Sequence, residues 1–387
     1  MKKKILLLAL VSISALSVYY GADFVSRVYL TKNEHSETVT QRYNDLVNST
    51  YSTKHSNGET FAKMTRGPPN VTAQWNRFMH LINENIRKLY LQSWDNVITP
   101  YVTKYMIDER DICNSLSLPF LLVFVPSLPA NTNERQTIRR TWGNFASQNT
   151  SSFNISARLV FMLGRMTNGI MFDRLVQKES TEYKDIVQFD FFESSYNLTR
   201  KMMYGLRWVK TYCNSVKYIL KVDDDTFINV ARLSNYLLTD SNINNKTIHG
   251  YSYPNGGPVL REGKYAVTKD DFPRSQFPPY VSGTSYILPY DAIPGMLDLA
   301  ERLPYCPVED AFITGVMRAI LDLKLKHSVD FTHMSERKID PCTFHSKLAV
   351  TNININCMNV LWNLTAPARE INCTLYRVLG NNACSIF

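Results

Sequence analysis

The sequence predicts an α/β fold with a mostly parallel sheet flanked by helices, preceded by a membrane anchor and a stem. From residue 118 onward, short apolar runs alternate with segments of helical periodicity, which is the pattern of successive βαβ units. Before that region lie an uncharged N-terminal stretch and a long polar segment, residues 23–112. With 387 residues and 44% hydrophobic content, the chain is large enough to bury a substantial core.

The N-terminus is typical of the secretory pathway. Residues 1–4 contain three lysines and residues 5–22 carry no charge, so we expect a short cytoplasmic tail followed by a signal-anchor transmembrane helix. A cleaved signal peptide is the alternative, because Ala15, Leu16 and Ser17 offer a cleavable spacing. A lumenal location fits the eight N-x-S/T sequons, at Asn48, Asn70, Asn149, Asn154, Asn197, Asn245, Asn363 and Asn372.

Residues 23–112 are predicted to form a lumenal stem. Their strongest helical pattern covers residues 73–94, where an apolar stripe indicates docking on the main domain or on a second copy, that is, a homodimer through the stem. The net charge of +9 is scattered apart from Lys2–Lys4, so a nucleic-acid groove is disfavoured and an anionic small substrate fits equally well.

The alternating region predicts its elements in order. We expect strands over 118–127, 158–164, 185–191 and 218–223, and helices over 131–147, 170–183, 197–213 and 230–238, with Asn197 as a helix cap. The predicted catalytic domain covers 113–345, and residues 346–387 form an extension packed on it. The seven cysteines show no metal-finger spacing, so in an oxidising lumen most should pair and one is left over.

Three consecutive aspartates, Asp223 to Asp225, follow the strand predicted to end at residue 223. In a parallel sheet, ligands bind at the carboxyl ends of strands. Three adjacent carboxylates repel one another, and Mg²⁺ or Mn²⁺ would resolve that conflict. The spacing excludes an EF-hand, because Ile228 and Ser234 occupy the positions of its glycine and glutamate. The alternative is a solvated acidic turn before the next helix.

A second acidic pair, Glu309 and Asp310, begins an apolar helical run that we expect to end near Leu325. Such acids are either partners of the helix dipole or, beside a cleft, a general base. The chain has no G-x-S-x-G, H-E-x-x-H, G-x-G-x-x-G or Walker sequence. A metal-binding carboxylate cluster with a separate carboxylate base indicates transfer from a phosphorylated donor.

Five blocks resemble, in order, those of the animal β-1,3-glycosyltransferase family: RQTIRRTWGN (135–144), DFFESSYNLTRK (190–201), LKVDDDTFIN (220–229), PPYVSGTSYILP (278–289) and VEDAFITG (308–315). The similarity covers roughly residues 118–345. It implies an inverting hexosyltransferase with a GT-A fold, built as a single-pass type II Golgi membrane protein, with a UDP-sugar donor, a glycan acceptor on glycoprotein or glycolipid, and no nucleic-acid partner.

The resemblance also implies roles for the residues that match its motifs. Asp225 and Asp223 would hold Mn²⁺, with Mg²⁺ as the alternative, and the nucleotide would contact Asp223, Asp224, Arg135 and Arg139. Asp310 would be the catalytic base that deprotonates the acceptor 3-hydroxyl. Glu309, Tyr280, Ser282 and Gly283 would line the sugar pocket. A late histidine completes the family's metal site, and His345 is the best match, with His333 as the alternative.

Five positions depart from the family pattern: Ser285 for glycine, Glu193 for aspartate, Ser195 for an aromatic residue, Tyr265 for tryptophan and Phe277 for tyrosine. None removes the expected metal ligand or base, so we expect activity. They leave the donor open between galactose, or a related hexose, and the N-acetylhexosamines GlcNAc and GalNAc. A non-catalytic glycan-binding relative is the other alternative, and the presence of both acidic clusters argues against it.

Overall fold

The structure, a computed structural model, describes residues 97, 99–102, 104–114, 118–146, 155–167, 169–240, 243–263, 265–269, 271–333 and 346–365. All of them belong to the unit Pro68–Phe387. The predicted tail, the anchor at residues 5–22 and the stem helix at residues 73–94 lie outside the described residues. Within the described ranges, no helix is long and apolar enough to cross a membrane.

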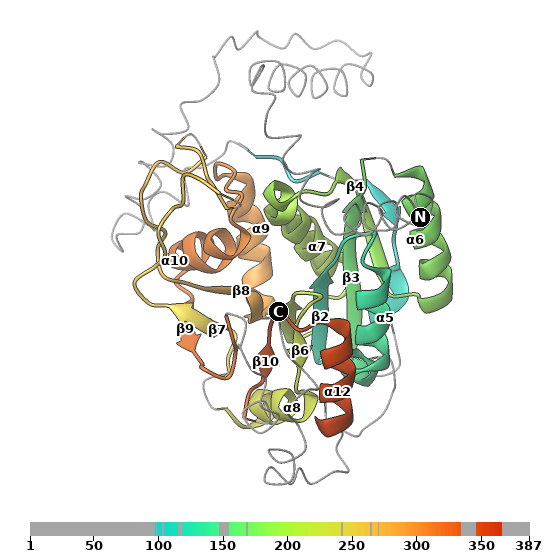
Figure 1. The fold of residues 1–387 in the computed structure, drawn as a ribbon. Coiled ribbons are helices and arrows are strands. Elements are labelled where there is room, and N and C mark those ends of the chain that lie inside the picture. The colour runs from blue at the N-terminus through green and yellow to red at the C-terminus, as the bar shows by residue number, and fades with distance from the viewer. Residues whose placement is uncertain are drawn as a thin grey trace, which may run out of the picture. The chain divides into compact units, whose positions relative to one another are not determined.

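An eight-stranded sheet forms the centre of the described unit, in the order β1-β4-β3-β2-β5-β8-β7-β9 (Figure 1). Its central strands β4, β3, β2 and β5 are parallel, β1 and β8 run antiparallel to their neighbours, and β9 is parallel to β7. The predicted α/β class with a mostly parallel sheet is therefore confirmed. The strands are β1 Tyr105–Ile107, β2 Leu121–Pro126, β3 Ala157–Arg165, β4 Ile186–Phe192, β5 Tyr218–Val222, β7 Thr247–Tyr253, β8 Tyr280–Pro289 and β9 Lys324–His327.

Helices cover both faces of this sheet, which explains why β2 is apolar along its whole length. Leu122 and Phe124 pack into one core layer with α7 and α9, whereas Leu121 and Val123 pack into a second layer with α5, α8 and α12 (Figure 1). The helices are α5 Thr132–Arg140, α6 Ile170–Tyr183, α7 Leu198–Tyr212, α8 Val230–Thr239, α9 Ile293–Glu301, the π-helix η6 Ala311–Met317, α10 Arg318–Ile320 and α12 Ile355–Thr365.

Two predicted helix boundaries are wrong. The helix expected over 131–147 ends at Arg140, and a 3-10 turn, Trp142–Ala146, follows it. The run expected to reach Leu325 ends at Ile320, because Asp322 adopts a left-handed conformation (φ 58°) and the chain then enters β9.

Asn197 has the position of a helix cap, but its side chain does not cap α7. Its amide instead donates a hydrogen bond to the carbonyl of Phe192 (2.9 Å), and the Ser194 hydroxyl accepts from the Asn197 N–H.

The folded unit begins before the predicted domain boundary at residue 113. β1 pairs with β4, and the Cys113–Cys213 disulfide ties the following turn to the end of α7. The stem boundary predicted at residue 112 therefore lies inside the folded unit. At the other end, residues 346–365 contribute β10 (Ala349–Val350), which pairs with β6 (Phe227–Ile228), and α12. Among the described cysteines, Cys306 is a buried free thiol.

Gly205 permits the close contact between α7 and β2. The effect of adding a methyl group at this position on protein stability can therefore be predicted. A Cβ at Gly205 would lie 2.0 Å from Cζ of the buried Phe124 ring. Gly205→Ala is expected to lower the free energy of unfolding by about 1–3 kcal/mol, because overpacking outweighs the gain in helix propensity. Chemical denaturation measures this loss.

Gly295 on α9 offers a matched control. A Cβ there would meet only the Leu321 side chain, at 3.2 Å, so Gly295→Ala is expected to be neutral or mildly stabilising. Equal losses in the two variants would contradict the packing argument.

Candidate active site

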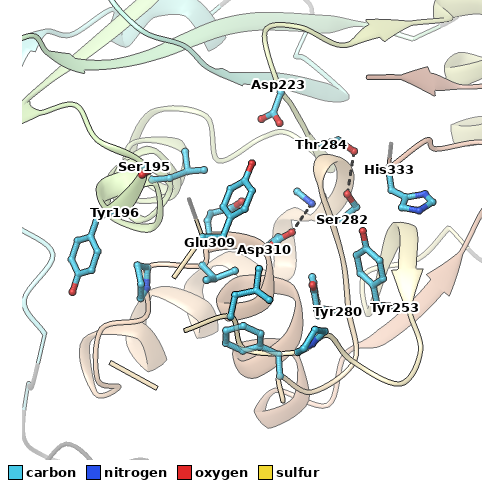
Figure 2. A pocket seen from close by; sticks show the side chains of 18 of the residues that line it. Ser195, Tyr196, Asp223, Tyr253, Tyr280, Ser282, Thr284, Glu309, Asp310 and His333 are labelled. Atoms are coloured by element: carbon cyan, nitrogen blue, oxygen red, sulfur yellow. Dashed lines mark hydrogen bonds between the residues drawn. The ribbon is translucent and has the colours of Figure 1, made fainter. Parts of the chain in front are cut away.

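A pocket of about 460 Å³ lies where the carboxyl end of β5 meets β8 and the start of η6 (Figure 2). It brings together six predicted site residues from three segments of the chain: Asp223, Tyr280, Ser282, Gly283, Glu309 and Asp310. The strand order explains this, because β5 and β8 are neighbours in the sheet and η6 packs against β8.

Two backbone amides hold the Asp310 carboxylate at the floor of this pocket. Oδ2 accepts a hydrogen bond from the Gly283 N–H and Oδ1 accepts one from the Ala311 N–H, each at 2.8 Å. A Cβ at Gly283 would lie 3.1 Å from Asp310 Oδ2, so glycine allows β8 to approach this closely. Burial raises the pKa of Asp310 above its ordinary value, and the two amides oppose that rise.

Glu309 is turned toward the protein interior. Its Oε1 accepts a hydrogen bond from the Tyr286 hydroxyl at 2.6 Å, and its Oε2 lies 4.0 Å from Lys221 Nζ. Burial raises the pKa of Glu309 to about 7, which Lys221 partly opposes. With its oxygens engaged by Tyr286 and Lys221, Glu309 is less suited than Asp310 to receive a substrate proton.

Lys221 is a site residue that the sequence reasoning missed. Its ammonium lies 2.5 Å from Asp223 Oδ1 and also donates to the Gly283 carbonyl. Burial disfavours its charge, but the carboxylates of Asp223 and Glu309 outweigh that effect and hold the pKa of Lys221 above its ordinary value. The signal was a lysine inside the otherwise apolar run YILKV (218–222).

The other two aspartates of the cluster differ in their partners, and neither lines the pocket. Asp224 Oδ2 accepts from the Ser127 hydroxyl at 2.7 Å and from the Asn131 amide at 3.0 Å. Within the described residues, the Asp225 carboxylate accepts a single long hydrogen bond, 3.4 Å, from the Thr226 hydroxyl. Burial, followed by the charges of Asp223 and Asp224, raises the pKa of Asp225 to about 6.

These contacts test whether a divalent cation fits. Asp225 is a half-buried carboxylate, destabilised by two neighbouring carboxylates and without a cationic side chain in contact among the described residues, so a hard cation suits it. The described part of the chain contains no group of three or more His, Cys, Asp or Glu side chains arranged to hold a metal. His345 lies outside the described residues, whereas His333 lines the pocket.

Arg135 and Arg139, which were predicted to contact the nucleotide, are engaged by carboxylates of the protein in this structure. Arg135 is completely buried and pairs with Glu179 at 2.6 Å, while Arg139 pairs with Glu179 and Asp185, each at 2.7 Å. Charges buried this deeply require partners, and these lie 40 or more residues away in the sequence.

The same buried network also holds the aspartate cluster in place through hydrogen bonds. Arg135 donates to the Ser127 hydroxyl at 3.2 Å, and that hydroxyl donates to Asp224. Lys201 donates to the Ser127 carbonyl at 2.7 Å and pairs with Glu193 at 2.6 Å. Arg135 and Lys201 therefore position Ser127, and through it Asp224.

Aromatic side chains form one wall of the pocket, of which the sequence indicated Tyr280 but not Tyr253. Tyr253 and Tyr280 pack with ring centroids 4.9 Å apart, and His333 stacks on Tyr251 at 3.7 Å. Figure 2 shows Tyr253 and His333 on one side of Asp310 and Tyr196 on the other. Such walls suit the apolar faces of sugar rings.

Comparisons with known proteins identify the family of the chain. The family model for galactosyltransferases matches residues 133–329. The chain is 28% identical over 277 residues to beta-1,3-galactosyltransferase 1 of Mus musculus and of Homo sapiens, covering 71% of this chain and 82% of each relative. It is 30% identical over 239 residues to beta-1,3-galactosyltransferase 5 of Gorilla gorilla gorilla, covering 59% of this chain and 78% of the relative.

Among solved structures, a glycosyltransferase involved in glycosylation of the PBCV-1 major capsid aligns with a TM-score of 0.32 and 12% identity, covering 60% of this chain and 92% of that one. The family model covers half of the chain, and its span includes the aspartate cluster, the β8 strand and Asp310. The sheet places the acidic cluster at the carboxyl end of β5, as the sequence predicted. The chain belongs to the galactosyltransferase family.

Proposed function

We propose that this protein is an inverting β-1,3-galactosyltransferase that moves galactose from UDP-galactose to the 3-hydroxyl of a glycan acceptor. The observation that carries the proposal is the Asp310 carboxylate, held by two backbone amides at the floor of a sugar-sized pocket that also contains Asp223. The similarity to beta-1,3-galactosyltransferases 1 and 5 supports the donor and the linkage.

Asp310 acts as the general base. Each of its oxygens accepts one amide hydrogen bond, and a carboxylate oxygen offers about two lone-pair sites, so a site remains for the acceptor hydroxyl proton. The amides fix the carboxylate, so the base is oriented before the acceptor arrives. As the proton leaves, the acceptor oxygen attacks the anomeric carbon from the face opposite UDP, and one displacement gives a β product from an α donor. No enzyme nucleophile is needed.

The donor is bound at the carboxyl end of β5. Asp225, with Asp223, would hold Mn²⁺, or Mg²⁺ as the alternative, and the ion would neutralise charge on the UDP diphosphate. Burial raises the pKa of Asp223, Lys221 opposes that rise, and Lys221 joins Asp223 to the β8 backbone beside Asp310. Lys221 thereby fixes the position of Asp223, on the donor side of the site, relative to Asp310, on the acceptor side.

Incubation of the full chain with Mn²⁺, a panel of UDP-sugars and a set of β-linked acceptors tests the proposal. UDP-galactose is expected to be the preferred donor, with a β-1,3 linkage in the product by NMR. Preferred use of UDP-GlcNAc or UDP-GalNAc would favour a hexosaminyltransferase of the same kind. Binding of glycans without transfer from any donor would favour a glycan-binding relative.

We also propose a type II orientation in the Golgi membrane, with the catalytic unit in the lumen. In that case, protein from eukaryotic cells carries N-glycans, and glycosidase treatment increases its electrophoretic mobility. Asn245 lies in an exposed turn and is a suitable acceptor, so Asn245→Gln is expected to remove one glycan. Asn235→Gln, outside any sequon, is the control. The absence of any glycosidase shift would exclude the lumenal orientation.

A further inference from the structure

Exposed apolar side chains surround the opening of the pocket. Tyr196, Leu260 and Tyr265 line it, yet 46%, 47% and 61% of their surfaces are exposed. Leu260 and Tyr265 come from the segment between β7 and β8, residues 254–279, and Tyr196 precedes α7. Large apolar groups left in water beside a binding pocket indicate that part of a ligand covers them.

The charge of the pocket is opposite to that needed for an anionic acceptor. The acidic residues that line it are Asp223, Glu309 and Asp310, and Lys221 is the single Lys or Arg among its described lining residues. Lys221 is already engaged by Asp223 and the Gly283 carbonyl. A sulfate or carboxylate group near Asp310 would face like charges without a compensating cation in this lining.

These rim residues belong to the acceptor side of the site. Asp310, the proposed base, lines the pocket, and so does Asp223, whereas Asp225, the other proposed metal ligand, does not. Tyr196 is fixed in place, since its hydroxyl donates to Asp271 at 2.8 Å. Figure 2 shows Asp310 between Tyr196 and the wall formed by Tyr253 and His333, so the base lies in an aromatic-walled cleft.

We propose that the acceptor is an uncharged glycoside with an apolar aglycone, which packs on Leu260 and Tyr265 while the sugar lies between the aromatic walls at Asp310. This inference rests on the proposed transferase activity and specifies its acceptor class. Covering two half-exposed apolar side chains with several methylene groups favours such an acceptor by about tenfold over one without an aglycone.

The test uses the full chain with Mn²⁺, UDP-galactose and the best β-hexoside acceptor in three forms: the methyl glycoside, the octyl glycoside below its micellar concentration, and the 6-sulfated octyl glycoside. The octyl form is expected to show a KM about tenfold lower than the methyl form, with similar kcat. The sulfated form is expected to be poorer by tenfold or more. Leu260→Ala and Tyr265→Ala should bring the octyl-to-methyl ratio toward one.

Leu238→Ala is the matched control, because Leu238 is equally exposed (52%) on α8 but does not line the pocket, so the octyl preference should persist. Equal use of sulfated and neutral acceptors, or an octyl preference that survives both rim substitutions, would overturn the proposal. Calorimetric binding of the three glycosides without donor gives the same ranking independently of turnover. Binding with the predicted ranking but no transfer from any donor would contradict the proposed function alone.

Discussion

Replacing Asp310 with asparagine is expected to lower kcat by about 10²–10⁴-fold while leaving UDP-galactose binding nearly unchanged. The amide is close in shape to the carboxylate and cannot take a proton at neutral pH. Its carbonyl oxygen can still accept from the Gly283 or Ala311 N–H, so the local fold is preserved. The loss should fall on kcat, because the base acts mainly in the transition state. Transfer kinetics and UDP calorimetry on the same preparation measure both quantities.

The pH profile gives an independent readout of the same residue. Asp310 must be ionised to act, and burial raises its pKa above the ordinary aspartate value. Activity is therefore expected to fall as the pH decreases through a pKa higher than that of an exposed aspartate, and this limb should be lost from the residual activity of Asp310→Asn. Asp298→Asn, an exposed substitution on α9, controls for the loss of one negative charge. Near wild-type transfer by Asp310→Asn would instead make Glu309 the candidate base.

The sequence predicted those residues of the candidate site for which the local sequence pattern and the chemistry agree. Asp223 follows a buried strand, and Asp310 begins a helical segment, so both positions follow from periodicity. That the two lie in one pocket depends on β5 and β8 being sheet neighbours. The family resemblance implied this pairing, but residue spacing alone does not.

Several contacts at the site could not be predicted from the sequence, because the deciding partner lies far away along the chain. Arg135 and Arg139 lie in a motif that resembles a nucleotide-binding block, and only the fold brings Glu179 and Asp185 against them. Lys221 has one partner nearby in the sequence, Asp223, but its other partners, on β8 and at Glu309, are more than 60 residues away. Long-range ion pairs leave no local signature, whereas alternating strands and helices do.

The ends of helices are also difficult to predict from the sequence. The apolar periodicity continues to Leu325, yet η6 and α10 end at Ile320 because the chain turns to pair β9 with β7. A non-glycine residue in the left-handed conformation, Asp322, marks that turn and is not a strong stop signal in a sequence. Tertiary pairing decides the boundary.

Replacing Asp225 with asparagine is expected to weaken Mn²⁺-dependent UDP binding and turnover together, by at least about 100-fold, since even an outer-shell partner of a metal ligand is worth about 10–100-fold. A neutral amide is a poor ligand for a hard cation. Asp225 is the member of the cluster whose carboxylate has the weakest contacts within the described structure, a single 3.4 Å hydrogen bond. Chelation with EDTA is expected to abolish wild-type activity, and Mn²⁺ should restore it better than Mg²⁺.

Asp224→Asn is the matched control, because it removes the same charge from the same cluster. Asp224 is bound by Ser127 and Asn131, and an asparagine can still accept one of those hydrogen bonds. If Asp225 is the metal ligand, the Asp224 variant should bind Mn²⁺ and UDP far more tightly than the Asp225 variant, as measured by calorimetry and by the Mn²⁺ EPR signal. If the cluster acts only through its summed charge, the two variants should lose binding equally. Full activity in chelator would remove the metal from the proposal. Asp225 would then be a half-buried carboxylate whose pKa is raised to about 6 in the folded protein. Because the folded state binds this proton more tightly than the unfolded state, the protein would lose stability as the pH rises from the unfolded-state pKa of Asp225 to about 6.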